Sequence, residues 1–168
     1  FAGEGLDLRA LLDHKEKTGS VMDFSGARNI TNEELLALDI DILIPAALEN
    51  VITIDNSSRV KARLIAEFAN GPVTGDADAL LQARGIPILP DILCNGGGVI
   101  VSYLEMVQNF NLDHWDAEEV QARLEKKMVD AYRAVHALAS GNNVPMRQAG
   151  YTIAVGRVVT AMKYRGWV

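Results

Sequence analysis

The sequence contains one cysteine, Cys94, among 168 residues, so no disulfide can form within the chain. This usage fits a reducing compartment, and we expect a cytoplasmic location. Acidic residues outnumber basic ones by 22 to 16, and the net charge of −6 leaves no basic stripe to neutralise phosphates. We therefore expect no nucleic-acid partner. Apolar runs such as residues 42–48 are far shorter than a bilayer span, so no membrane partner is expected either.

Several signatures of known chemistry are lacking as well. The three histidines, His14, His114 and His136, have no partner at metal-ligand spacing, so we expect no bound metal. There is no G-x-S-x-G nucleophile turn and no phosphate-binding P-loop. The glycines at positions 3 and 5 do not continue into the dinucleotide fingerprint G-x-G-x-x-G, and no strand precedes them. The sequence therefore contains no glycine loop for a dinucleotide pyrophosphate.

The composition, with 49% hydrophobic and 23% charged residues, is that of a globular domain. Apolar strand-like segments alternate with helical patterns, which is typical of an α/β fold with a parallel sheet. We expect strands at residues 40–46, 63–67 and 86–89, and a further short strand at 21–24. Helices are expected at residues 6–18, 31–38 and 75–84. A Thr31/Glu34 capping box opens the second of these helices, and Thr74 is expected to cap the third.

From Val99 onward the pattern is helical only. Asp116 and Glu119 predict a capping box at the start of a long helix, and the run Gly141-Asn142-Asn143 is expected to end it. A last helix is predicted over residues 146–165. The chain thus divides into an α/β part, residues 1–95, and a helical part, residues 96–168.

A glycine turn, Gly96-Gly97-Gly98, follows Asn95 and leads into one of these helices. Glycines bring bare backbone N–H groups close to a ligand at such a strand-to-helix junction. Ser102 is then expected within the first helical turn. The residues alone leave a second interpretation open, in which the turn is only a tight connection and the asparagines are turn formers.

Five segments in this order resemble the glutamate dehydrogenases of the Glu/Leu/Phe/Val dehydrogenase family. They are Pro45-Ala46-Ala47-Leu48-Glu49-Asn50, Ala69-Asn70-Gly71-Pro72, Pro90-Asp91-Ile92-Leu93, Asn95-Gly96-Gly97-Gly98-Val99 and Ser102-Tyr103-Leu104-Glu105-Met106-Val107-Gln108-Asn109. The ending Met162-Lys163-Tyr164-Arg165-Gly166-Trp167 fits the same family. The resemblance extends over essentially the whole chain.

The resemblance implies the C-terminal, NAD(P)-binding portion of such an enzyme. The fold implied is an incomplete Rossmann-like parallel sheet, without its first strands and glycine fingerprint, followed by C-terminal helices. The activity implied is oxidative deamination of L-glutamate to 2-oxoglutarate and ammonia with NAD or NADP, in a homo-oligomer. The catalytic lysine and aspartate of the family belong to a preceding domain, so the isolated chain is expected to be inactive. The start at Phe1, without an initiator methionine, is interpreted as a cut through a longer protein.

The resemblance also implies roles for four residues that contact the cofactor. Ala46 and Ala47 end a strand where small side chains let the nicotinamide ring and its ribose lie against the backbone. Asn70 matches the asparagine that binds the nicotinamide ribose. Asn95 matches the asparagine that holds the nicotinamide carboxamide and so selects the ring face that meets the substrate.

Two further positions match substrate-binding residues of the family. Val99 matches a residue that lines the pocket for the substrate side chain. Ser102 matches the hydroxyl that binds the distal carboxylate, which favours glutamate over leucine or valine. Two positions depart from the family pattern: Phe68 and Gly96 stand where the family usually has glycine and alanine.

An incomplete sheet would leave the strand at residues 40–46 with a bare backbone edge. We expect the chain either to self-associate through this edge or to rearrange its first 30–40 residues to cover it. Two other functions stay open at this point. One is a non-catalytic nucleotide-binding or assembly module, and the other is a dehydrogenase of another amino acid.

Overall fold

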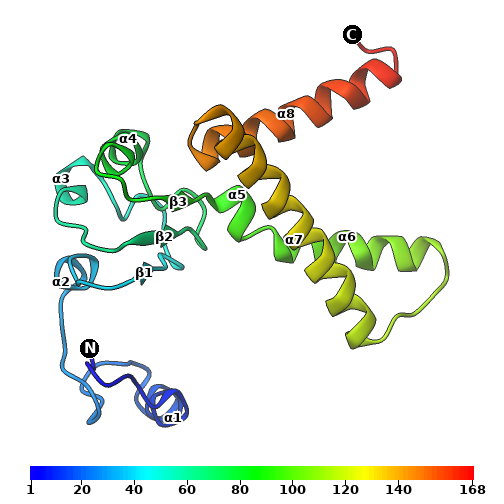
Figure 1. The fold of residues 1–168 in the computed structure, drawn as a ribbon. Coiled ribbons are helices and arrows are strands. Elements are labelled where there is room, and N and C mark those ends of the chain that lie inside the picture. Colours follow the sequence, from blue (N-terminus) through cyan, green and yellow to red (C-terminus); the bar gives the residue numbers. More distant parts are fainter.

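Three short strands form a parallel sheet in the order β1-β2-β3 in the computed structural model, which describes all 168 residues. The strands are β1 (Ile42–Leu43), β2 (Leu64–Ala66) and β3 (Ile88–Leu89). Ile42 is opposite Leu64, and Ile65 is opposite Ile88. The sheet sits in the first half of the chain, and long helices follow it (Figure 1). The α/β class and the parallel sheet with C-terminal helices are therefore confirmed.

Five helices accompany the sheet: α1 (Leu8–Thr18), α2 (Asn32–Leu36), α3 (Ile54–Ser57), α4 (Gly75–Ala83) and α5 (Asp91–Cys94). The capping box of α2 is confirmed, because the Thr31 hydroxyl accepts from the Glu34 N–H and the Glu34 carboxylate accepts from the Thr31 N–H. The prediction that the Thr74 side chain caps α4 is wrong. Thr74 occupies the N-cap position but makes no capping hydrogen bond.

Three longer helices complete the chain: α6 (Gly97–Phe110), α7 (Ala117–Asn142) and α8 (Met146–Tyr164). Asp116 caps α7 by accepting from the Glu119 N–H. The second hydrogen bond of the expected capping box, from the Asp116 N–H to the Glu119 carboxylate, is not formed, because the Glu119 carboxylate binds Arg123 instead. Helix α7 also continues through Asn142 and ends at Asn143, whose φ of 52° is left-handed.

Three sequence expectations need correction. Residues 21–24 form turns and not a strand, because no neighbouring strand pairs with them and Phe24 instead packs edge-on against the His14 ring. The strand expected at 40–46 is confined to β1, since Pro45 has no N–H for a ladder. Helix α6 begins at Gly97, so Ser102 lies in its second turn and not its first.

Two clusters of buried side chains stabilise the fold. The larger one lies between the sheet, helix α4 and the segments on either side of α3, and the smaller one joins α5, α7 and α8. The first contains Leu43, Ile52, Val60, Ala62, Ile65, Val73, Ala77, Leu81, Ile86 and Ile88. The second contains Leu93, Val135, Ala139 and Ala149. No helix combines the length and the apolarity that a bilayer span requires.

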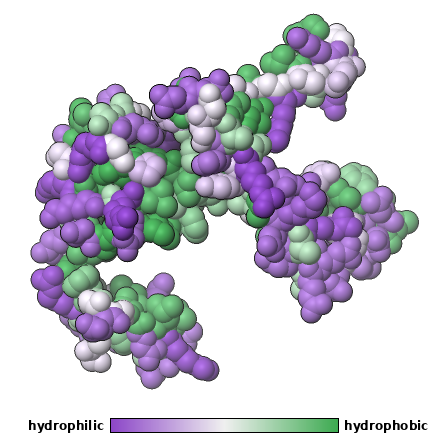
Figure 2. Space-filling view, viewed as in Figure 1, coloured by the Kyte–Doolittle hydropathy of each residue, from purple (hydrophilic) through white to green (hydrophobic).

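Strand β1 is an exposed edge of the sheet. It pairs with β2 alone, and the side chains of Ile42 and Ile44 are 52% and 48% exposed. Figure 2 shows apolar surface over the region of the sheet. Residues 1–31 supply no strand to this edge, and α1 lies apart from the sheet (Figure 1). The rearrangement expected as one alternative has not taken place, which leaves self-association as the prediction.

We predict that the 168-residue chain associates through the β1 edge, because an unpaired apolar strand recruits further chains. Replacing Ile42 by lysine should weaken the association several-fold, measured by analytical ultracentrifugation over a concentration series. Leu80→Lys is the matched control, since Leu80 is a similarly exposed leucine on α4. A monomeric wild-type chain, or equal effects of the two variants, would contradict the prediction.

Candidate functional site

The loops that follow the three strands meet at one edge of the sheet, because parallel strands end on the same side. Hydrogen bonds tie the loops together. The N–H groups of Phe68 and Ala69, after β2, donate to the Pro45 carbonyl, after β1, at 3.1 and 2.9 Å. The Gly71 N–H donates to the Asp91 carboxylate, after β3, at 2.9 Å. The carboxyl edge is therefore one connected surface.

Asn70 and Asn95 are in direct contact on this surface. The Asn95 side-chain amide Nδ2 donates to Asn70 Oδ1 at 2.7 Å. The chain turns sharply beside Asn70, where Gly71 takes a φ of +52° that glycine adopts without strain. No protein group binds Asn95 Oδ1 or Asn70 Nδ2, so the pair presents one acceptor and one donor. The two asparagines predicted from the sequence thus form a joint hydrogen-bonding unit.

Ala46 and Ala47 lie in the first of the three loops, next to the buried Pro45, and both are exposed. Their small side chains leave the backbone of this loop accessible. Phe68, in the second loop, is 51% exposed and lies between the buried Glu67 and the buried Ala69. The carboxyl edge therefore presents alanine and asparagine side chains together with one aromatic ring.

Val99 and Ser102 lie on helix α6, three residues apart and so on one face. Val99 is exposed, and the Ser102 hydroxyl donates to the Gly98 carbonyl at 3.1 Å. Ser102 contacts neither asparagine. It borders a shallow hollow of about 450 Å³, which Glu105, Met106, Asn109 and Phe110 also line. The structure therefore brings Asn70 and Asn95 together and keeps Ser102 in a separate hollow further along α6.

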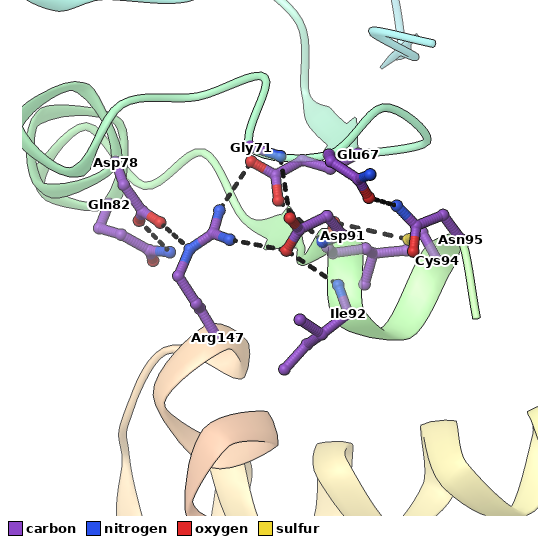
Figure 3. A network of polar contacts seen from close by, with 11 residues as sticks. Glu67, Gly71, Asp78, Gln82, Asp91, Ile92, Cys94, Asn95 and Arg147 are labelled. Atoms are coloured by element: carbon purple, nitrogen blue, oxygen red, sulfur yellow. Dashed lines mark hydrogen bonds and ion pairs between the residues drawn. The ribbon is translucent and has the colours of Figure 1, made fainter. Parts of the chain in front are cut away.

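A cluster of charged residues lies to one side of Asn95 (Figure 3). The Arg147 guanidinium, from α8, binds three carboxylates: Glu67 at 2.7 Å, Asp91 at 3.2 Å and Asp78. Glu67 is fully buried, and its second carboxylate oxygen accepts from the Asp91 N–H at 2.8 Å. We refer to Arg147, Glu67, Asp78 and Asp91 as the Arg147 cluster.

Two opposing effects act on Arg147. Burial by itself lowers the pKa of Arg147, but the hydrogen bonds and charges of Glu67 and Asp78 outweigh burial and raise the pKa above its ordinary value. The guanidinium is therefore charged at any working pH. Sequence reasoning did not identify this cluster. The one local signal is Glu67 itself, a charged residue at the carboxyl end of an apolar strand.

Cys94 lies beside the cluster, with its sulfur 3.5 Å from the Leu89 carbonyl. Burial raises the pKa of the Cys94 thiol, and the charges of Glu67 and Asp91 raise it further. The thiol is therefore the dominant form near neutral pH, and the thiolate, which is the nucleophile, is scarce. This supports the packing role for Cys94 over a reactive one.

We predict that Cys94 reacts with iodoacetamide several-fold more slowly at pH 8 than a peptide thiol does, because less of it is ionised. The rate should rise with pH along a curve displaced to higher pH. Mass spectrometry of timed samples measures the rate, and the same chain in denaturant is the control, since unfolding exposes the sulfur. A native rate equal to the denatured rate would show that the local environment does not protect the thiol.

The asparagine pair has the chemistry to hold the nicotinamide half of a dinucleotide. A carboxamide needs both a donor and an acceptor, as does a ribose hydroxyl, and the pair offers both. The exposed alanines beside Pro45 leave room for a ring against the backbone. No glycine loop for the pyrophosphate accompanies them in this sequence, so the residues fit one half of the cofactor.

A parallel sheet with helices, and with alanine and asparagine side chains at its carboxyl edge, defines an α/β protein of the Rossmann-like class. The model of one family, described as Glutamate/Leucine/Phenylalanine/Valine dehydrogenase, matches residues 1–166. The chain belongs to this family.

Similar proteins are found among both sequences and structures. A glutamate dehydrogenase of Thermotoga maritima and an NAD-specific glutamate dehydrogenase of Clostridioides difficile are each 47% identical to the chain, over 97% of its length and 39% of theirs. The hetero-hexameric glutamate dehydrogenase from Thermus thermophilus, in a leucine-bound form, has a TM-score of 0.88 at 33% identity, covering 98% of this chain and 39% of that one. L-tryptophan dehydrogenase from Nostoc punctiforme has a TM-score of 0.68 at 26% identity, covering 88% and 42%.

Proposed function

We propose that the chain forms the nicotinamide side of the active site, and part of the substrate site, of an NAD(P)-dependent glutamate dehydrogenase. The reaction is the oxidation of L-glutamate to 2-oxoglutarate and ammonia. The observation that carries the proposal is the hydrogen-bonded Asn70–Asn95 pair at the carboxyl edge, in a chain of this family. The chain spans 39% of the length of the two relatives named above, so other parts of such an enzyme supply the remaining groups.

The proposed roles follow from the position of each side chain. Asn95 orients the nicotinamide carboxamide and Asn70 the adjoining ribose, while Ala46 and Ala47 leave space for both. Bound NAD(P) supplies the hydride chemistry, and the chain orients the ring that takes part in it. On α6, the Ser102 hydroxyl turns from the Gly98 carbonyl to donate a hydrogen bond to the distal carboxylate of the substrate, and Val99 contacts the substrate side chain.

Several further proposals rest on narrower observations. The NAD-specific relative from Clostridioides difficile favours NAD over NADP. The hetero-hexameric relative from Thermus thermophilus supports an oligomeric assembly, for which a homo-oligomer is our proposal, and the single cysteine supports a cytoplasmic location. The larger buried cluster lies wholly within residues 1–95 and supports a division into residues 1–95 and 96–168, with Leu93 of the first part packing against α7 and α8 of the second. The catalytic lysine and aspartate are proposed to lie outside this chain.

The test compares the 168-residue chain with the complete gene product that contains it. Glutamate-dependent formation of NADH, followed at 340 nm, is expected for the complete product and not for the chain alone. Asn95→Ala in the complete product should weaken NADH binding, and Thr160→Ala, on the distant end of α8, is the control. Turnover by the chain alone would contradict the assignment of the catalytic residues.

A dehydrogenase of another amino acid is the second candidate. The likeness to an L-tryptophan dehydrogenase favours it, and Ser102 argues against it, because its hydroxyl offers a hydrogen bond that a distal carboxylate can accept and an apolar side chain cannot. A panel of glutamate, leucine, valine, phenylalanine and tryptophan separates the two. NADH binding without oxidation of any amino acid would instead indicate the non-catalytic nucleotide-binding or assembly module.

A further inference from the structure

The Arg147 cluster joins helix α8 to three elements of the α/β part. Its guanidinium binds Glu67 at the end of β2, Asp78 in α4 and Asp91 at the start of α5 (Figure 3). These partners lie 80, 69 and 56 residues away in the sequence. A planar guanidinium with five N–H donors suits such a position, because it can bind several carboxylates in fixed directions.

The cluster fixes the loop that carries Asn70 at both ends. Glu67, at the first end, binds Arg147 through one oxygen and the Asp91 N–H through the other. Gly71, at the second end, donates its N–H to Asp91 Oδ2 at 2.9 Å. Asn70 lies directly before Gly71. The position of its backbone therefore depends on carboxylates that Arg147 holds.

The same cluster also fixes the position of Asn95. The Asn95 N–H donates to the Asp91 carbonyl at 2.9 Å, and Asp91 Oδ1 accepts from the Ile92 N–H at 2.8 Å, which orients the short helix α5. Asp91 is thus shared by the two loops whose asparagines meet at 2.7 Å. A displacement of the Asp91 carboxylate would move both members of the pair.

We propose that Arg147 is a positioning residue, which sets the geometry of the Asn70–Asn95 pair through Glu67 and Asp91 and so makes the pair depend on the placement of α8. Arg147 is the one cation bound to the fully buried Glu67, and no other contact of Glu67 replaces it. The positioning itself does not depend on the proposed function. Its consequence for dinucleotide binding does rest on the proposed function.

The test compares Arg147→Lys with Arg63→Lys in the 168-residue chain. Lysine keeps the charge but cannot bind three carboxylates in the planar arrangement of arginine. Arg63 is the matched control, because it stands at the opposite end of β2 from Glu67, in an exposed ion pair with Asp41. The readout is the NMR signal and proton exchange of the Asn70 and Asn95 side-chain amides, assigned with Asn70→Asp and Asn95→Asp.

We expect Arg147→Lys to shift both amide signals and to speed exchange of the Asn95 amide by about tenfold, the effect of losing one hydrogen bond. Arg63→Lys should change neither. A double variant, Glu67→Gln with Arg147→Met, separates positioning from stability, because it removes the fully buried unpaired charge, while Asp78 and Asp91 are partly exposed and keep other hydrogen bonds. If the double variant is folded by circular dichroism and the amide pair is still altered, positioning is supported. An unaltered pair in either folded variant overturns the proposal, as does failure of both variants to fold, which would make the cluster purely structural.

A second experiment measures the binding of NADH to the complete gene product. Arg147→Lys is expected to raise the dissociation constant of NADH about tenfold, again by one hydrogen bond, and Arg63→Lys to leave it unchanged. Absence of NADH binding by the wild type would contradict the proposed function and leave the amide result to decide the positioning role. Equal NADH affinity of the wild type and Arg147→Lys would overturn the coupling of Arg147 to the cofactor site.

Discussion

Replacing Arg147 by methionine is expected to lower the free energy of unfolding by about 3–5 kcal/mol, the usual cost of leaving a buried charge without its partner. Glu67 is fully buried, and it would keep a single N–H donor from Asp91 in place of an ion pair. Urea denaturation followed by circular dichroism measures the change. Arg147 is charged at any working pH, so the wild-type chain keeps these ion pairs throughout the measurement.

The control for this substitution is Arg63→Met. Arg63 also forms an ion pair, with Asp41, but both side chains are about 80% exposed, and such pairs contribute little. Adding Glu67→Gln to Arg147→Met should recover part of the lost stability, because the fully buried unpaired charge is then gone, while Asp78 and Asp91 still lack their cation. Equal losses for Arg63→Met and Arg147→Met, or no recovery in the double variant, would contradict the account of the cluster.

Ser102→Ala is expected to lower kcat/KM for glutamate in the complete enzyme by roughly 10- to 150-fold. This range corresponds to about 1.5–3 kcal/mol for a hydrogen bond to a charged group, at 1.4 kcal/mol for each factor of ten. The loss should fall mainly on KM, since the hydroxyl is proposed to bind the distal carboxylate before and during the reaction. Initial rates over a range of glutamate concentrations give both parameters.

Norvaline provides the internal comparison, because it has a side chain of similar length without the carboxylate. Its kcat/KM should not fall in Ser102→Ala, so the preference for glutamate should shrink. Thr160→Ala is the matched control, since the Thr160 hydroxyl likewise donates to the carbonyl four residues before it on a helix. A parallel loss with both substrates would show that Ser102 acts on the structure of α6 and not on the carboxylate.

The separation of Ser102 from the asparagine pair bears on the proposed reaction. Ser102 is on the second turn of α6, in a hollow that neither Asn70 nor Asn95 lines. A nicotinamide ring held by Asn95 and a carboxylate held by Ser102 would therefore lie at different places along the same strand-to-helix connection. This arrangement suits a substrate with its reacting carbon at one end and a carboxylate at the other.

Local signals in the sequence predicted most elements correctly, and the exceptions have physical reasons. The capping pattern at Thr31 and the apolar run before Pro45 each depend on residues within a few positions. The prediction of a strand at residues 21–24 was wrong because a strand must pair with a neighbouring strand, and none lies beside these residues. Of the capping box expected at Asp116, only the hydrogen bond from the Glu119 N–H to Asp116 is formed, because the Glu119 side chain pairs with Arg123.

The sequence alone was enough to establish the α/β order and the helical second half, because these depend on periodicity and turn residues within short segments. The candidate asparagines followed from the resemblance of short motifs to the family. The contact between Asn70 and Asn95 joins residues 25 positions apart, and the pair of Arg147 with Glu67 joins residues 80 apart. No local sequence pattern predicts such contacts between distant residues. They arise when parallel strands bring their ends to one edge and α8 packs against it, so the folded chain alone reveals which polar groups act together.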